Sequence, residues 1–138
     1  MRYFDAGALA TRYVREKGSL KVRRLLSSDV PATSRLSAVE IVSALMRRVR
    51  EGALSKEDCD RVFASLDADL TAMLVVELTT AVVTRAQLLL QRHPLRAGDA
   101  IQLASCLYLQ EELEDEASFV AFDERLITAA RAEQLKVW

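Results

Sequence analysis

The stretch FVAFDERLITAARAEQLKVW, residues 119–138, places a helical segment between two short β-like segments. The β-like segments are Phe119 to Phe122 and Lys136 to Trp138, and the helical segment between them is Glu124 to Glu133. Short strands that alternate with longer helices indicate a mostly parallel sheet with helices on its faces. This stretch therefore predicts an α/β fold.

The rest of the chain repeats this alternation. Gly18 and Gly52 are expected to end two of the helices, because glycine is common just past a helix C-terminus. The helix that begins at Gly98 is apolar on almost every side and is therefore predicted to be buried. The other expected strands are 2–4, 30–33 and 73–78, and the other expected helices are 8–15, 20–27, 38–51, 55–68, 80–92 and 98–113. The sequence thus predicts about five strands and about seven helices.

Length and charge limit the possible classes of protein. A chain of 138 residues is typical of one domain, so we expect residues 1–138 to form a single domain. The 19 Lys and Arg residues nearly balance the 20 Asp and Glu residues, for a net charge of -1. This balance excludes a polybasic nucleic-acid coat and an acidic disordered tail.

The cysteines, the single histidine and the lengths of the uncharged runs exclude further classes of protein. Cys59 and Cys106 are far apart and His93 is the only histidine, so the chain has no classical zinc site. The two cysteines are expected to be reduced thiols in the core of a cytoplasmic protein. The longest run without charge, Ala100 to Gln110, is too short to span a membrane. We therefore expect neither a membrane segment nor a signal peptide.

Four acidic residues occupy similar places in the predicted fold. Asp5 and Asp123 each directly follow a predicted strand. Glu40 lies in the first turn of the helix after the second strand, and Asp99 opens the buried helix. Ligands of such sheets bind outside the carboxyl ends of the strands. If all four acids lie at that edge, they converge on one crevice.

Converging carboxylates favour a metal site. Two like charges about 4 Å apart repel by about 4 kcal/mol at an effective dielectric near 20, so the group either raises its own pKa values or binds cations. Oxygen ligands without His or Cys favour Mg²⁺ or Mn²⁺. A pair of such ions activates water and stabilises the leaving oxygen of a phosphodiester, so the pattern suits phosphodiester hydrolysis.

A purely structural interpretation of the same acids is also open. Ser37 to Glu40 matches a capping box, in which Glu40 only satisfies a backbone N–H. Asp5, Asp99 and Asp123 each lie at a predicted helix start, where an acid caps free N–H groups. Position alone does not decide between caps and metal ligands.

The segments around these acids resemble, in order, the acidic motifs of PIN-domain proteins. The resemblance is strongest to the VapC-type ribonuclease toxins of bacterial toxin–antitoxin pairs, and it covers essentially the whole chain. The segments are YFDAGAL at 3–9, TSRLSAVE at 33–40 with SAL at 43–45, LRAGDAIQLA at 95–104 and FDERL at 122–126.

The resemblance implies a three-layer α/β/α fold and a metal-dependent endoribonuclease that cuts single-stranded or looped RNA. Asp5, Glu40, Asp99 and Asp123 match the acidic quartet of the family, which holds one or two Mg²⁺ or Mn²⁺ ions. Water would attack the scissile phosphorus in line and leave a 5′-phosphate and a 3′-hydroxyl. The implied partners are RNA, a cognate antitoxin and a second copy of the chain in a homodimer.

The sequence departs from the family pattern at three positions. Ala6 and Gly7 replace the usual hydroxyl pair after the first aspartate, and Ala121 replaces a common Ser or Thr before the last one. Such hydroxyls orient a carboxylate or a bound water, and their loss typically lowers metal affinity or activity 10–100-fold. The alternative is therefore a catalytically weak PIN-like domain that acts as a protein-binding or regulatory module with its antitoxin. A related flap-cleaving deoxyribonuclease is a third, less favoured class.

Basic and aromatic residues give weaker signals. Arg96, three residues before Asp99, is a candidate to hold a substrate phosphate, or else to pair with one of the acids. The cluster Arg47 to Arg50 either contacts phosphates or forms the solvated end of a helix. Tyr108 and Trp138 are expected to be packing or dimer residues, because 6% aromatic content indicates no RNA-stacking surface.

Overall fold

The computed structural model describes all 138 residues and shows one five-stranded sheet. The strand order is β3-β2-β1-β4-β5, and every neighbouring pair is parallel. The strands are β1 (Arg2–Phe4), β2 (Pro31–Ser34), β3 (Leu74–Val76), β4 (Ser118–Val120) and β5 (Lys136–Val137). The sheet is thus parallel throughout, and all its strands end at the same edge.

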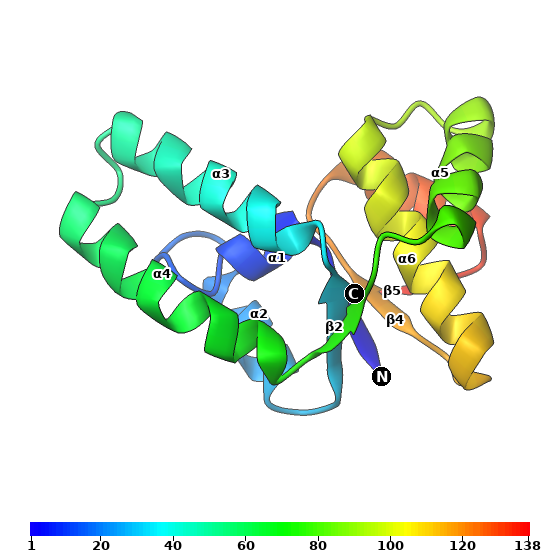
Figure 1. The fold of residues 1–138 in the computed structure, drawn as a ribbon, viewed down its shortest axis with the longest axis horizontal. Helices are drawn as coiled ribbons and strands as arrows, with labels where there is room; N and C mark the ends of the chain where they lie inside the picture. Colours follow the sequence, from blue (N-terminus) through cyan, green and yellow to red (C-terminus); the bar gives the residue numbers. More distant parts are fainter.

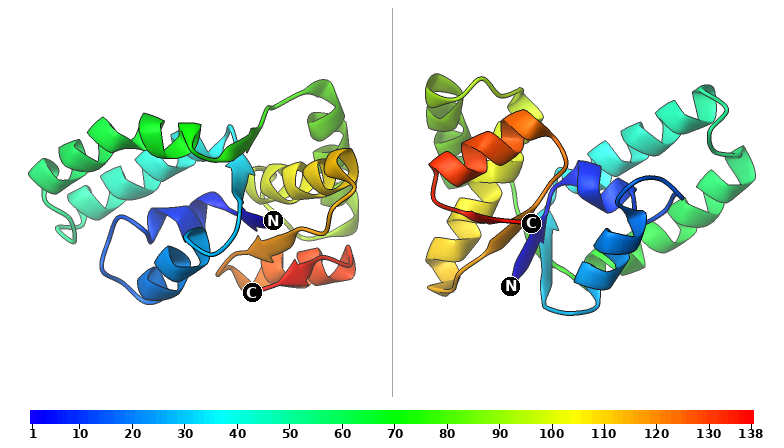
Figure 2. Two further views of the ribbon diagram at one scale, coloured as in Figure 1. Left: turned by 90° about the horizontal axis from the view of Figure 1, so that it is seen from below. Right: turned by 180° about the vertical axis from the view of Figure 1, so that it is seen from behind.

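Seven helices cover the sheet, and Figures 1 and 2 show that the earlier helices lie on one side and the later ones on the other. The first side has α1 (Ala6–Ala10), α2 (Ser19–Leu26), α3 (Ser37–Arg50) and α4 (Lys56–Thr71). The second side has α5 (Thr80–Arg92), α6 (Ala97–Leu113) and α7 (Glu124–Ala132). The predicted α/β fold with three layers, five strands and seven helices is therefore confirmed.

The core consists of two clusters separated by the sheet. Successive side chains of a strand point to opposite faces. Tyr3 and Phe119 accordingly pack with α5, α6 and α7, and Phe4 and Val120 pack with α1 to α4. The rings of Tyr3 and Phe119 are stacked, with centroids 5.6 Å apart. Helix α6 is packed into the first cluster, as its apolar sequence predicts.

The start of the chain differs from the prediction. The helix expected at 8–15 is α1 and already ends at Ala10. Gly18 does not end it but precedes α2, with a left-handed φ of 95°. The intervening loop is held by Ser19, whose hydroxyl accepts the Glu16 N–H at 3.0 Å and donates to the Val14 carbonyl at 2.6 Å. These side-chain bonds satisfy the backbone without a longer helix.

Smaller findings concern the strand ends, the cysteines and the helix lengths. Strand β4 ends at Val120, so Asp123 lies three residues beyond the strand rather than directly after it. Cys59 and Cys106 are buried and free, as predicted. No helix combines the length and the apolar character that crossing a membrane requires.

Gly18 is required by a tertiary contact as well as by its φ. A Cβ at this position would lie 2.6 Å from Cζ of Phe122, whereas a Cβ at Gly52, which has a φ of 75°, would meet nothing within 4 Å. Gly52→Ala therefore carries only the left-handed strain of about 1–2 kcal/mol. We expect Gly18→Ala to lower the free energy of unfolding by at least about 1 kcal/mol more. Urea unfolding of the two variants measures the difference, and equal losses would show that Phe122 moves aside freely.

Candidate active site

All four predicted acids line one cleft at the carboxyl edge of the sheet. The cleft has a volume of about 1000 Å³ and lies beside the ends of β1 and β4. Its acidic lining residues are Asp5, Glu16, Glu40, Asp99, Asp123 and Glu124. The connections from β1 lead to one side of the sheet and those from β4 to the other, and such a switch point is where open parallel sheets bind ligands.

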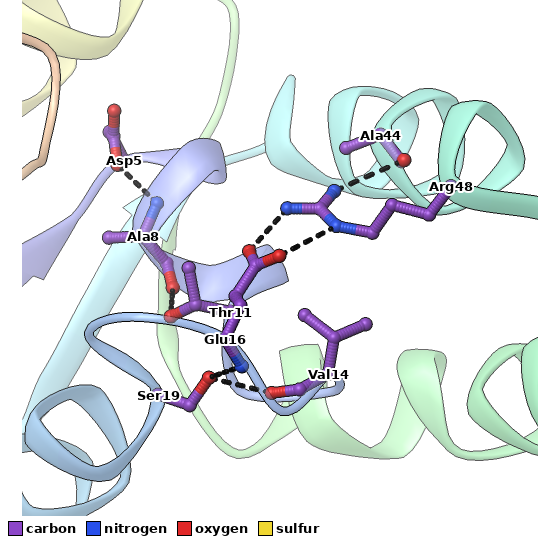
Figure 3. A network of polar contacts seen from close by, with 8 residues as sticks. All are labelled: Asp5, Ala8, Thr11, Val14, Glu16, Ser19, Ala44 and Arg48. Atoms are coloured by element: carbon purple, nitrogen blue, oxygen red, sulfur yellow. Dashed lines mark hydrogen bonds and ion pairs between the residues drawn. The ribbon is translucent and has the colours of Figure 1, made fainter. Parts of the chain in front are cut away.

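Asp5 caps helix α1, and its surroundings disfavour the charged form of its carboxyl group. Its side chain is only 7% exposed, and its Oδ1 accepts the Ala8 N–H at 2.6 Å (Figure 3). Burial raises the pKa of Asp5 to about 7, and the charges of Asp99, Glu40 and Asp123 add to this rise against the Ala8 hydrogen bond. Asp5 does cap α1, but a helix cap needs only one acid and does not explain why three further carboxylates lie close enough to repel it.

Glu40 does not form the capping box that the sequence allowed. Helix α3 has Leu36 at its N-cap and no side-chain cap, because the Ser37 hydroxyl is hydrogen bonded to Thr33 at 2.7 Å instead. The Glu40 carboxylate points into the cleft region, where a Cβ on Gly98 would lie 2.4 Å from its Oε1. Burial raises the pKa of Glu40, and the charge of Asp99 adds to the rise.

Gln102 is a site residue that sequence reasoning missed. Its Nε2 donates to Glu40 Oε2 at 2.8 Å and to Ser37 Oγ at 3.0 Å, and its Oε1 accepts the Tyr3 hydroxyl at 2.8 Å. Tyr3 and Gln102 are both buried, so the phenol fixes the orientation of the amide and the amide fixes Glu40. The available signal was one amide in the apolar part of α6, three residues after Asp99 and therefore on the same helix face.

Asp99 and Asp123 complete the acidic set. Asp99 is in the first turn of α6, and burial followed by the charge of Asp123 raises its pKa. Asp123 is the N-cap of α7, and its Oδ1 accepts the Leu126 N–H at 3.0 Å. Neither these acids nor Asp5 and Glu40 form an ion pair with a basic side chain. None of the four carboxylates is therefore neutralised by a direct ion pair, although the charges of Arg96 and Arg125 lower the pKa of Asp99 from a greater distance.

The structure brings the acids into one cleft but not into one coordination sphere. No group of three or more His, Cys, Asp or Glu side chains is close enough to hold a metal ion together. The donor set itself suits a hard cation, because it contains only carboxylate oxygens that repel one another.

The basic residues are placed differently from one another. Arg96 is exposed and is not among the residues that line the cleft, although its charge lowers the pKa of Asp99. Arg47 and Arg48 do line the cleft, whereas Arg50 does not. Figure 3 shows Arg48 of α3 paired with Glu16 of the loop after α1. Arg47 is exposed, and Lys17 and Lys21 are exposed in the same cleft.

The three positions without hydroxyls also line the cleft: Ala6, Gly7 and Ala121. A Cβ at Gly7 would lie 3.4 Å from Asp5 Oδ2 and 3.6 Å from Asp5 Oδ1, which is ordinary contact distance. A side chain at position 7 would therefore touch the Asp5 carboxylate without displacing it.

Comparisons with known sequences show the family to which the chain belongs. A family model of the PIN domain matches residues 2–132. Ribonucleases VapC45 and VapC49 of Mycobacterium tuberculosis are each 33% identical over 137 residues, which are 98% of this chain and 92% of theirs. The chain therefore belongs to the PIN-domain family and, within it, to the VapC type.

Solved structures share the fold at lower identity. VapC20 of Mycobacterium tuberculosis, a sarcin-ricin loop cleaving toxin, has a TM-score of 0.70 and 20% identity, covering 94% of this chain and 95% of its own. FitAcB from Neisseria gonorrhoeae has a TM-score of 0.66 and 12% identity, covering 100% and 96%. A toxin-antitoxin complex from Klebsiella pneumoniae has a TM-score of 0.59 and 16% identity, covering 86% and 84%. At these identities, the likeness concerns the fold alone.

The raised pKa of Asp5 makes a prediction about stability. Between about pH 4 and pH 7 the folded protein retains a proton that the unfolded chain has lost, so the free energy of unfolding falls as the pH rises. A shift from 3.8 to about 7 corresponds to a loss of up to about 4 kcal/mol. We expect the Asp5→Asn variant to avoid this loss and to keep the cap on Ala8, since Asn caps as well as Asp.

Urea unfolding at pH 5 and pH 8, in the presence of a chelator, measures the effect. The free energy of unfolding of Asp5→Asn should exceed that of the parent by more at pH 8 than at pH 5. Asp67→Asn removes an exposed carboxylate outside the cleft and is the matched control. An advantage of the same size at both pH values would show that Asp5 is not destabilised by ionisation.

Proposed function

We propose that the protein is a metal-dependent endoribonuclease that hydrolyses RNA phosphodiester bonds and is the toxin of a type II toxin–antitoxin pair. The observation that carries the proposal is the set of four carboxylates that line one cleft without forming an ion pair. Support comes from the two relatives at 33% identity, both of which are ribonucleases by name.

In this proposal Asp5, Glu40, Asp99 and Asp123 hold one or two Mg²⁺ or Mn²⁺ ions. Bound there, such ions supply an activated water and stabilise the leaving oxygen of a phosphodiester. The hydrogen bonds from Ala8 and Gln102 each engage one oxygen of their carboxylate, Oδ1 of Asp5 and Oε2 of Glu40. The second oxygen of each is left for a ligand.

Several partners follow from the same proposal. The exposed Lys17, Lys21 and Arg47 in the cleft suit the phosphates of RNA. The net charge of -1 is a sum over the chain and does not reveal this local group of positive charges. Arg96 remains a proposed phosphate contact from outside the cleft lining. An antitoxin and a homodimer are proposed by analogy, the first because a structural neighbour is a toxin-antitoxin complex. A cytoplasmic location is part of the same proposal.

Metal binding and cleavage together test the function. We expect Mn²⁺ to bind at neutral pH, to raise the melting temperature and to permit cleavage of a single-stranded RNA. Asp99→Asn should lower cleavage by at least about 100-fold and weaken Mn²⁺ binding, as measured by calorimetry.

The control for this test is Glu112→Gln, which removes one exposed charge at the opposite end of the same helix. It should bind Mn²⁺ and cleave as the parent does. Cleavage by Asp99→Asn at the parental rate would refute the role of this acid, and cleavage of DNA but not RNA would refute the choice of substrate.

A second candidate is a catalytically weak PIN-like domain that acts as a protein-binding or regulatory module with its antitoxin. The absence of hydroxyls at Ala6, Gly7 and Ala121 favours it. The contact distance between position 7 and Asp5 gives a way to separate the two candidates.

Gly7→Ser restores one hydroxyl beside the Asp5 carboxylate, and Gly7→Ala adds the same Cβ without it. If the missing hydroxyl limits an enzyme, Gly7→Ser should raise Mn²⁺ affinity or cleavage by about 10-fold over Gly7→Ala. Calorimetry and a gel-based cleavage assay measure both quantities. A parent and a Gly7→Ser variant that neither bind Mn²⁺ nor cleave would favour the regulatory module.

A further inference from the structure

The exposed aromatic side chains of the protein are concentrated in the acidic cleft. Eight residues are aromatic: four Phe, three Tyr and one Trp. Only Phe122 and Trp138 are exposed, by 41% and 44%, and both line the cleft that contains the four acids. Large aromatic side chains are normally buried, so the presence of both exposed rings in one cleft points to a ligand.

Strand register places Trp138 beside the acids. Phe119 is opposite Val137 in the β4–β5 pair, so Trp138 is next to Val120, which is itself opposite Phe4. Strands are about 4.8 Å apart, so Trp138 is about 10 Å from the end of β1, where Asp5 follows. Phe122 immediately precedes Asp123 in the chain. The two rings thus flank the acids on the β4–β5 side.

Both side chains are held in place. Gly18, on the loop across the cleft, lies so close to the Phe122 ring that a Cβ would be 2.6 Å from Cζ and 3.0 Å from Cε2. The backbone N–H of Trp138 donates to the Phe119 carbonyl at 3.0 Å, and the Arg2 guanidinium carbon is 5.2 Å from the centre of the indole ring. A preorganised aromatic surface loses little side-chain entropy when a ligand binds.

The rest of the cleft indicates the kind of ligand. Lys17, Lys21 and Arg47 are exposed in the same cleft and carry positive charge. Aromatic platforms combined with basic groups hold single-stranded nucleic acids, because every unpaired base offers a face for stacking. A base inside a duplex has no free face. An apolar protein segment fits this cleft less well, since six acidic and four basic side chains line it.

We infer that Phe122 and Trp138 form a stacking wall that takes an unpaired base next to the scissile phosphate, while the basic residues hold the backbone. The low aromatic content predicted no such surface, but the fold gathers the only two exposed rings at the site. The inference rests on the proposed function for its ligand, RNA, but it concerns binding and can be tested without cleavage.

Trp138 is the only tryptophan, so its fluorescence reports on the wall directly. The experiment titrates the protein with a short single-stranded RNA of mixed sequence in EDTA, where no divalent ion is free. We expect saturable quenching, which the same RNA in a duplex does not produce. Phe122→Leu should weaken the binding by about tenfold.

Phe63→Leu makes the same substitution in the α3–α4 side of the core and is the control, with binding expected to be unchanged. Circular dichroism of both variants checks that they are folded. Quenching that is absent with single-stranded RNA, equal with duplex, or equally affected by the two substitutions overturns the inference.

The result is separable from the proposed function. Cleavage of RNA in Mn²⁺ without quenching in EDTA would overturn the stacking wall and leave the nuclease standing. Quenching with the expected Phe122 dependence, but no cleavage in Mn²⁺, would support the wall and refute the catalytic proposal.

Discussion

Repulsion among carboxylates at one edge of a parallel sheet is the constraint around which this protein is built. Parallel strands all end at the same edge, and the chain has an acid just beyond β1, beyond β4 and in the first turns of α3 and α6. Asp5 is the most costly of these acids, because it is buried and its pKa is raised to about 7. Ionisation of Asp5 in the folded protein therefore lowers the free energy of unfolding.

Hydrogen bonds restrain two of these acids, one through a local helix cap and one between helices on opposite sides of the sheet. The Ala8 N–H of α1 holds Asp5, and the Gln102 amide of α6 holds Glu40 of α3. The hydroxyl of Tyr3 in β1 donates to the Gln102 amide oxygen and thereby fixes the orientation of the amide. Every buried side-chain polar atom of the protein has a hydrogen-bond partner, so this polar bridge does not leave unpaired groups in the core.

The cleft combines three kinds of side chain that the overall composition conceals. Six acids line it, lysines and arginines come from α2, α3 and the loop after α1, and two aromatic rings come from the β4–β5 side. A net charge of -1 and 6% aromatic residues suggest neither a phosphate-binding nor a base-stacking surface. The fold, rather than the number of such residues, brings acidic, basic and aromatic side chains together in one cleft.

The sequence by itself determined the parallel sheet, its five strands and the edge at which the four acids lie. These features depend on local patterns, the alternation of short apolar strands with helices and the position of each acid after a strand or at a helix start. Local patterns failed at the end of α1, where a loop bonded to Ser19 of α2 follows instead of more helix. They also left open a capping box for Glu40, which is bonded to Gln102 instead. Only the tertiary structure decided that Gln102 meets Tyr3, 99 residues away, and that Phe122 and Trp138 line the same cleft. No short-range pattern encodes which distant side chains will meet.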